Sequence, residues 1–112
     1  MFIVGVPDKA TMKWLKKKKY ITATDEGEAI GIAGGYYLAT GKKATVFMSA
    51  DGFCNALNPI TSWVLSDKVK MDLIISSGRQ EKQHRVMSTI LRDIIKLLEY
   101  ENPKTISFKI IE

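Results

Sequence analysis

Short apolar stretches alternate with longer amphipathic stretches along this chain of 112 residues. The short stretches are rich in apolar and β-branched residues and are bounded by Gly, Pro, Asp or Ser, a pattern typical of buried strands. In the longer stretches, apolar residues recur at the spacing of an α-helix. Strands are expected at residues 2–4, 20–23, 44–49, 71–76 and 105–111. Helices are expected at residues 9–18, 25–40 and 83–99, and another should follow a turn at residues 51–52 and run to about residue 66.

This alternation predicts the fold class. Near-continuous apolar strands separated by helices are typical of a parallel sheet that is covered on both faces. We therefore expect a three-layer α/β fold with a mostly parallel sheet and helices on both faces, formed as a single domain over residues 1–112. Ligands of such sheets bind outside the carboxyl ends of the strands. Polar residues gather after four expected strands, at positions 5–8, 23–26, 49–55 and 76–79.

The last expected helix, residues 83–99, is amphipathic. An apolar side of this kind normally packs on a core. The apolar positions that recur at helical spacing are Val86, Ile90, Ile94, Leu97 and Leu98.

The expected helix at residues 25–40 is unusual because Gly27, Gly31, Gly34 and Gly35 fall on one of its faces. Gly costs about 1 kcal/mol relative to Ala inside a helix. A face without side chains lets another backbone or a ligand approach closely. Two interpretations stay open: this face packs tightly within the chain, or it stays bare for another backbone or a ligand. The rest of the helix is mostly apolar, so we expect it to be buried.

Two carboxylates mark the start of this helix. Asp25 is expected as the N-cap, with Glu28 three residues later completing a capping box, and Gly41 suits the C-terminal end. Capping accounts for Glu28, and simple stabilisation of the helix N-terminus by a negative charge would account for Glu26.

The net charge is +5, and much of it comes from Lys13 and the lysine run at residues 16–19. This run has no interleaved aromatics or reader motif, so we expect a solvated helix end and no nucleic-acid partner, although an acidic partner or an anionic substrate fits equally well. The single cysteine, Cys54, excludes an internal disulfide and fits a reducing compartment. No leader or long apolar segment is apparent, so we expect a cytoplasmic protein without a membrane anchor.

Motifs for several other chemistries are incomplete. No P-loop spacing occurs, no GxGxxG follows a strand, and no His/Cys cluster offers a zinc site. Residues 51–55 (Asp-Gly-x-x-Asn) look somewhat like a metal-diphosphate loop, but no second asparagine motif follows, so we expect no metal bound by this chain. Cys54 and His84 could act as a nucleophile pair only through tertiary proximity, and a packed cysteine is the simpler interpretation.

Five segments, in order along the chain, resemble the thiamine-diphosphate-dependent decarboxylases. Within this family the chain is most similar to the phosphonopyruvate decarboxylases, followed by the sulfopyruvate decarboxylases. The resemblance covers most of the chain, but only the pyrimidine-binding domain of those enzymes. The segments are Gly-Val-Pro-Asp at 5–8, Asp-Glu-Gly-Glu-Ala-Ile at 25–30, Gly-Tyr-Tyr-Leu-Ala-Thr-Gly-Lys at 35–42, Asn-Ala-Leu-Asn-Pro-Ile-Thr-Ser at 55–62 and Gln-His at 83–84.

The resemblance implies a catalytic role for Glu26. In the family, the Glu at this position hydrogen-bonds N1′ of the aminopyrimidine of thiamine diphosphate and promotes the tautomer that removes the thiazolium C2 proton. Such chemistry needs a carboxyl group in a dry site. The further site residues implied are Gly52 and Asn55 for the cofactor, and Asp8, Arg79 and His84 for the substrate. The alternatives are capping of the third helix for Asn55, a surface position for Arg79 and a helix-start position for His84.

The family's diphosphate-binding domain is absent from this sequence. The resemblance therefore implies a separate diphosphate-binding (beta) subunit that holds the Mg²⁺, a dimer-based assembly, and decarboxylation of phosphonopyruvate or a similar anionic 2-oxo acid only in that assembly. Some positions depart from the family: the N-terminus is short, Lys9 replaces a Ser, residues 49–54 differ and Gln80 replaces a Gly. The short N-terminus and the altered residues 51–54 favour a second hypothesis, a degenerate pyrimidine-domain module that binds a partner without chemistry.

Overall fold

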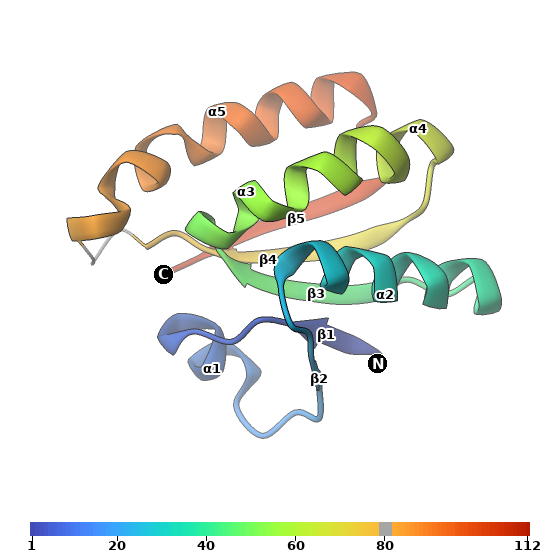
Figure 1. The fold of residues 1–112 in the computed structure, drawn as a ribbon, viewed down its shortest axis with the longest axis horizontal. Coiled ribbons are helices and arrows are strands. Elements are labelled where there is room, and N and C mark those ends of the chain that lie inside the picture. The colour runs from blue at the N-terminus through green and yellow to red at the C-terminus, as the bar shows by residue number, and fades with distance from the viewer. Residues whose placement is uncertain (79–81) are drawn as a thin grey trace.

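The computed structural model describes residues 1–78 and 82–112 of the chain. Its sheet has parallel pairing between all neighbouring strands, in the order second, first, third, fourth and fifth along the chain (Figure 1). This confirms the expected parallel sheet. The strands are β1 (Ile3–Gly5), β2 (Ile21–Thr22), β3 (Ala44–Ser49), β4 (Met71–Ser76) and β5 (Ile106–Ile111).

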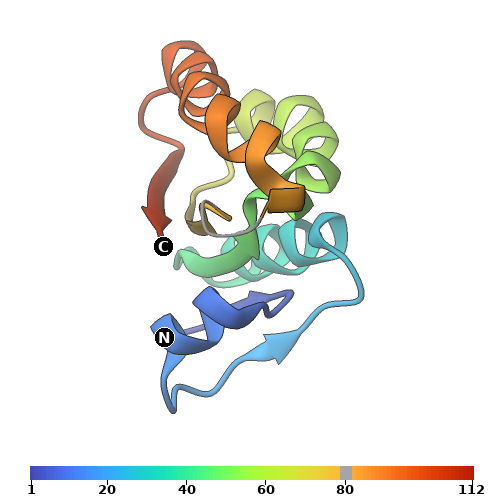
Figure 2. The ribbon, with the colours of Figure 1, turned by 90° about the vertical axis from the view of Figure 1, so that its left-hand side faces the viewer.

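Helices cover both faces of this sheet, as the three-layer prediction requires. One face is covered by α2, α3 and α5, and the other by α1 alone, which lies on the opposite side of the sheet in Figure 2. No helix in the described part of the chain is long and apolar enough to cross a membrane. The helical elements are α1 (Lys9–Leu15), α2 (Glu26–Thr40), α3 (Ala50–Pro59), the π-helix η1 (Ile60–Val64), α4 (Leu65–Asp67), the 3₁₀ turn η2 (Lys82–His84) and α5 (Arg85–Glu101).

The two faces of the sheet have cores of unequal size. Successive strand residues point to opposite faces, so in β3 the side chain of Met48 joins the core under α2, α3 and α5, whereas Phe47 points toward α1. The smaller core, on the α1 side, is formed by Ile3, Leu15, Phe47 and Ile74.

α1 ends at Leu15, three residues before its expected end. Lys16 has a positive φ of 55°, and the amide of Lys18 donates to the carbonyl of Leu15 at 3.0 Å, so the chain turns away. A longer helix would bring like charges of the lysine run one turn apart, which is destabilising. Instead, the Lys18 ammonium lies 5.0 Å from the ring centroid of Trp14, a cation–π contact.

The helix after β3 begins at Ala50, and not after a turn at residues 51–52 as expected. The hydroxyl of Ser49 caps it by accepting a hydrogen bond from the Gly52 amide at 3.0 Å. The residues expected to form the turn therefore belong to the first helical turn.

This helical run widens at Pro59. Proline has no N–H to donate to the carbonyl four residues earlier, and the π-helix η1 follows it directly, a common response to such a break. In η1, Trp63 packs on α2 so closely that a Cβ added to Gly34 would collide with the indole ring. The run ends with α4 at Asp67, close to the expected end.

α5 packs on the sheet with a side that differs from the expected one. Val86, Ile90 and Leu97 are 66%, 41% and 70% exposed, so their expected contact with the core is wrong. The helix carries two neighbouring apolar stripes offset by one position, and periodicity alone does not distinguish between them. Of the expected set, Leu98 is buried and Ile94 is partly buried. The buried residues of α5 are Met87, Leu91, Ile95 and Leu98.

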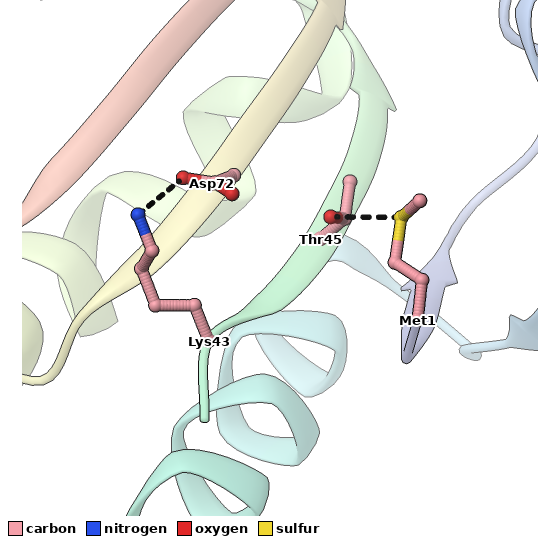
Figure 3. A network of polar contacts seen from close by, with 4 residues as sticks. All are labelled: Met1, Lys43, Thr45 and Asp72. Atoms are coloured by element: carbon pink, nitrogen blue, oxygen red, sulfur yellow. Dashed lines mark hydrogen bonds and ion pairs between the residues drawn. The ribbon is translucent and has the colours of Figure 1, made fainter. Parts of the chain in front are cut away.

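Two simple polar contacts lie where β3 and β4 begin (Figure 3). The ammonium of Lys43 is 3.4 Å from a carboxylate oxygen of Asp72, and the Thr45 hydroxyl donates to the sulfur of Met1 at 3.6 Å. Thr45 and Asp72 are register partners across the two strands. The ion-paired side chains are 51% and 36% exposed, so we expect the pair to contribute at most about 1 kcal/mol.

Candidate active site

The candidate site lies at the carboxyl ends of the strands, where α2 and α3 begin. Figure 2 shows the molecule from the side at which α3 and α5 start. In a parallel α/β sheet this edge is where ligands bind. Three of the expected site residues come together here: Glu26 from α2, and Gly52 and Asn55 from α3.

Glu26 is the first residue of α2, and only 8% of its surface is exposed. Its Oε1 accepts a hydrogen bond from Nδ2 of Asn55 at 2.9 Å. Its Oε2 lies against the backbone of Gly52, where any Cβ would collide with the carboxyl group. Within the described part of the chain, no group donates a hydrogen bond to Oε2. One oxygen of this buried carboxylate therefore has no hydrogen-bond donor among the described residues.

The backbones of the two helices approach each other beside this carboxylate. A Cβ on Gly27 would lie 3.4 Å from the carbonyl oxygen of Asn55, which is tight but tolerable. Further along, Gly34 contacts Trp63 of η1, the element that follows α3 directly. The position of Glu26 relative to Asn55 is thus set by packed helices.

Two of the four glycines on the glycine face of α2 pack within the chain, and the other two do not. Gly27 and Gly34 pack against α3 and η1 within the chain. Cβ atoms added at Gly31 and Gly35 would have no heavy atom within 4 Å. Internal packing thus accounts for half of this face.

The capping residues are placed nearly as expected. Asp25 accepts a hydrogen bond from the Glu28 amide at 2.8 Å, and α2 ends in Gly41 with a left-handed φ of 72°. The Glu28 carboxylate accepts from the amide of Thr24 at 2.8 Å, one residue before the N-cap, so the reciprocal bond of the expected capping box is shifted. Capping therefore accounts for Glu28.

Asp8, an expected substrate-binding residue, is the N-cap of α1 at the same edge of the sheet. Its Oδ1 accepts hydrogen bonds from the amide and hydroxyl of Thr11, at 2.8 and 2.6 Å. Its Oδ2 accepts from the hydroxyl of Ser76 at the end of β4, at 2.6 Å. Ser76 was not among the expected site residues, and its only signal in the sequence was its position as the last residue of an apolar strand. A substrate role for Asp8 stays a prediction.

Of the remaining candidates, Arg79 lies outside the described residues, as does the side chain of His84, whose backbone forms part of η2. Cys54 is exposed, with its sulfur 3.6 Å from that of Met87. The expectation of a packed cysteine is therefore wrong, because the neighbouring Phe53 takes the position on α3 that faces the core.

The comparison with known protein families agrees with this geometry. Residues 2–97 match the family described as thiamine pyrophosphate enzyme, N-terminal TPP binding domain. The chain belongs to this family. The expected resemblance to thiamine-diphosphate-dependent decarboxylases is thereby confirmed.

Individual relatives carry more specific names. The chain is 30% identical over 88 residues to a phosphonopyruvate decarboxylase of Streptomyces viridochromogenes, covering 74% of this chain and 22% of that protein. It is 37% identical over 105 residues to the sulfopyruvate decarboxylase subunit alpha of Methanocaldococcus jannaschii, covering 88% of this chain and 62% of the relative. It is 31% identical over 117 residues to the sulfopyruvate decarboxylase subunit alpha of Methanococcus maripaludis, covering 93% of this chain and 69% of that relative. The chain thus spans less than a quarter of the first relative and about two thirds of the others.

Proposed function

We propose that this chain, as a single pyrimidine-binding domain, is a subunit of a thiamine-diphosphate-dependent 2-oxo acid decarboxylase. The observation that carries the proposal is the buried Glu26 carboxylate, which keeps Oε2 available at the carboxyl edge of the sheet. Its membership of the TPP-binding family supports the choice of cofactor. The names of its relatives support decarboxylation as the reaction, with phosphonopyruvate or a similar anionic 2-oxo acid as the substrate.

The residues of the site fit the pyrimidine end of this cofactor. Burial removes water that would otherwise solvate the Glu26 carboxylate, and a carboxyl group in such a site can share a proton with a heterocyclic nitrogen. We assign that task to Oε2. Gly52 leaves room for the carboxyl group, and the amide of Asn55 holds its other oxygen. The cofactor, when bound, supplies the electron sink for the decarboxylation.

The rest of the active site is assigned to a partner subunit. Two of the relatives are named as subunits alpha, which supports a heteromeric enzyme. Within the described residues, no group of three or more His, Cys, Asp or Glu side chains could hold a metal ion. We therefore assign the diphosphate and its Mg²⁺ to a diphosphate-binding subunit, in a cytoplasmic assembly built on dimers that is inactive without this subunit.

The substrate contacts follow from its charge. An anionic 2-oxo acid needs cationic or hydrogen-bonding groups. We propose Arg79 and His84, which follow β4 in the sequence, and Asp8, the N-cap of α1, as the candidates. Variants of these residues should change KM for the 2-oxo acid more than they change kcat if the assignment is correct.

The decisive experiment is to copurify the chain with its diphosphate-binding subunit and to measure CO₂ release with thiamine diphosphate and Mg²⁺. Glu26→Gln should reduce kcat by about 10²- to 10⁴-fold, the range for loss of a general acid–base group. Glu28→Gln is the matched control: its amide oxygen can still accept from Thr24, so turnover should stay at the wild-type level. Equal CO₂ release by wild type and Glu26→Gln would refute the proposal.

The same mixture distinguishes the second hypothesis. A degenerate module would bind the partner subunit, and the complex would show no thermal shift with thiamine diphosphate. A thermal shift that depends on the cofactor, together with CO₂ release, would exclude a purely structural module.

A further inference from the structure

Asn55 makes a directed contact with the proposed catalytic carboxylate. A carboxylate can only accept hydrogen bonds, so the amide of Asn55 must present its nitrogen to Oε1 of Glu26. In the structure, Nδ2 of Asn55 lies 2.9 Å from this oxygen. Asn55 itself is exposed, whereas Glu26 is buried. The Asn55 amide therefore lies on the solvent side of the Glu26 carboxyl group, and Gly52 also contacts this group.

One face of α3 contacts both oxygens of the Glu26 carboxyl group. Gly52 and Asn55 are three residues apart, so they lie one above the other on the helix. Gly52 provides the space against which Oε2 lies, and Asn55 provides the donor for Oε1. The other asparagine nearby, Asn58, faces elsewhere and accepts a hydrogen bond from Ser62 at 2.8 Å.

A glutamate has three side-chain torsions, and fixing a long side chain costs conformational entropy. Gly52 permits the observed position of Glu26, but empty space does not select one rotamer. In the described residues, the amide of Asn55 is the group that hydrogen-bonds the carboxylate and selects that position.

We infer that Asn55 is a positioning residue, which acts through Glu26 and not on the cofactor directly. By holding Oε1, its amide keeps Oε2 in its place beside Gly52, the position from which the proposed proton sharing with the cofactor occurs. The catalytic consequence of this inference rests on the proposed function. The orientation of Glu26 does not, and it can be measured in the 112-residue chain without partner or cofactor.

The first experiment is NMR of this chain. The side-chain amide signal of Asn55 is assigned by its loss in Asn55→Ala, and it should move in Glu26→Ala. Three-bond couplings should give one dominant rotamer for Glu26 in the wild type and averaged rotamers in Asn55→Ala, while Asn58→Ala stays like the wild type. An averaged Glu26 in the wild type, or an unchanged rotamer in Asn55→Ala, would overturn the inference.

The second experiment measures kinetics in the complex with the diphosphate-binding subunit. Asn55→Ala should lower kcat by about 10- to 100-fold, the cost of a misplaced catalytic group, with KM for the 2-oxo acid little changed. Asn58→Ala, on the same helix, should retain the wild-type kcat. Unchanged kcat in Asn55→Ala would show that Glu26 needs no help in positioning.

Asn55→Asp gives a signature that a merely structural role would not produce. Two carboxylates at hydrogen-bond distance repel each other, but one proton shared between them restores a donor toward Oε1. The kcat of Asn55→Asp should therefore recover toward that of the wild type as the pH falls, whereas Asn55→Ala should show no recovery. Parallel pH profiles for both variants would overturn the inference. If the wild-type complex releases no CO₂, the proposed function fails, and the NMR experiment alone decides the role of Asn55.

Discussion

Replacing Gly52 by Ala tests the cradle around Glu26 without any assay of activity. The added methyl group would collide with the Glu26 carboxyl group, and overpacking of this kind costs about 1–3 kcal/mol. Ala is favoured over Gly inside a helix by up to about 1 kcal/mol. The net effect of Gly52→Ala on the free energy of unfolding is thus a loss of about 0–2 kcal/mol.

The same substitution should have the opposite sign when the carboxyl group is removed. In the Glu26→Ala background the three atoms nearest to the added methyl group are gone, so Gly52→Ala should stabilise the chain by up to about 1 kcal/mol. The double-mutant cycle therefore predicts a coupling energy of about 1–3 kcal/mol between the two positions.

Urea denaturation of the four proteins, followed by circular dichroism, measures this coupling. Gly35→Ala is the matched control, because an added Cβ there would have no heavy atom within 4 Å, and its effect should be the same with and without Glu26. A coupling energy below about 0.5 kcal/mol, the usual limit of additivity, would refute the placement of Glu26 against Gly52.

Two further pairs of variants test the packing. Gly34→Ala should destabilise the chain by about 1–3 kcal/mol because the methyl group meets an indole ring, whereas Gly35→Ala should stabilise it by up to about 1 kcal/mol. Equal midpoints in urea would count against the contact between α2 and η1. Leu91→Ala should cost about 2–5 kcal/mol because Leu91 is buried, and Leu97→Ala, at a 70% exposed position, should stay within about 0.5 kcal/mol of wild type. A larger loss of thermal stability in Leu97→Ala than in Leu91→Ala would instead support burial of the face that includes Leu97.

The fold could be predicted from the sequence because its strands are short, apolar and clearly punctuated. What failed were choices between equivalent local patterns. α5 has two apolar stripes, and only its packing on the sheet selects the one with Leu91. The end of α1 depends on a positive φ at Lys16, which no propensity of Lys predicts.

The site was predictable in part for a similar reason. Glu26 stands out in sequence because it is a carboxylate at the start of an apolar helix. Its pairing with Asn55 joins residues 29 positions apart, so it depends on how α3 crosses α2. Ser76 gave no signal of its own, because a serine after a strand is common in turns.

The unequal layers of this fold imply an order in which its parts open. α1 has seven residues and covers the smaller core, and β2 is an exposed edge strand of two residues, so this corner has few apolar contacts to break. Segments of this kind open at low free energy and exchange their amide hydrogens early. Because Asp8 belongs to α1 and Ser76 to β4, each such opening breaks the bond between them while leaving Glu26 and Asn55 together. We therefore expect the hydrogen bond between Glu26 and Asn55 to outlast the one between Asp8 and Ser76 when this corner of the fold opens.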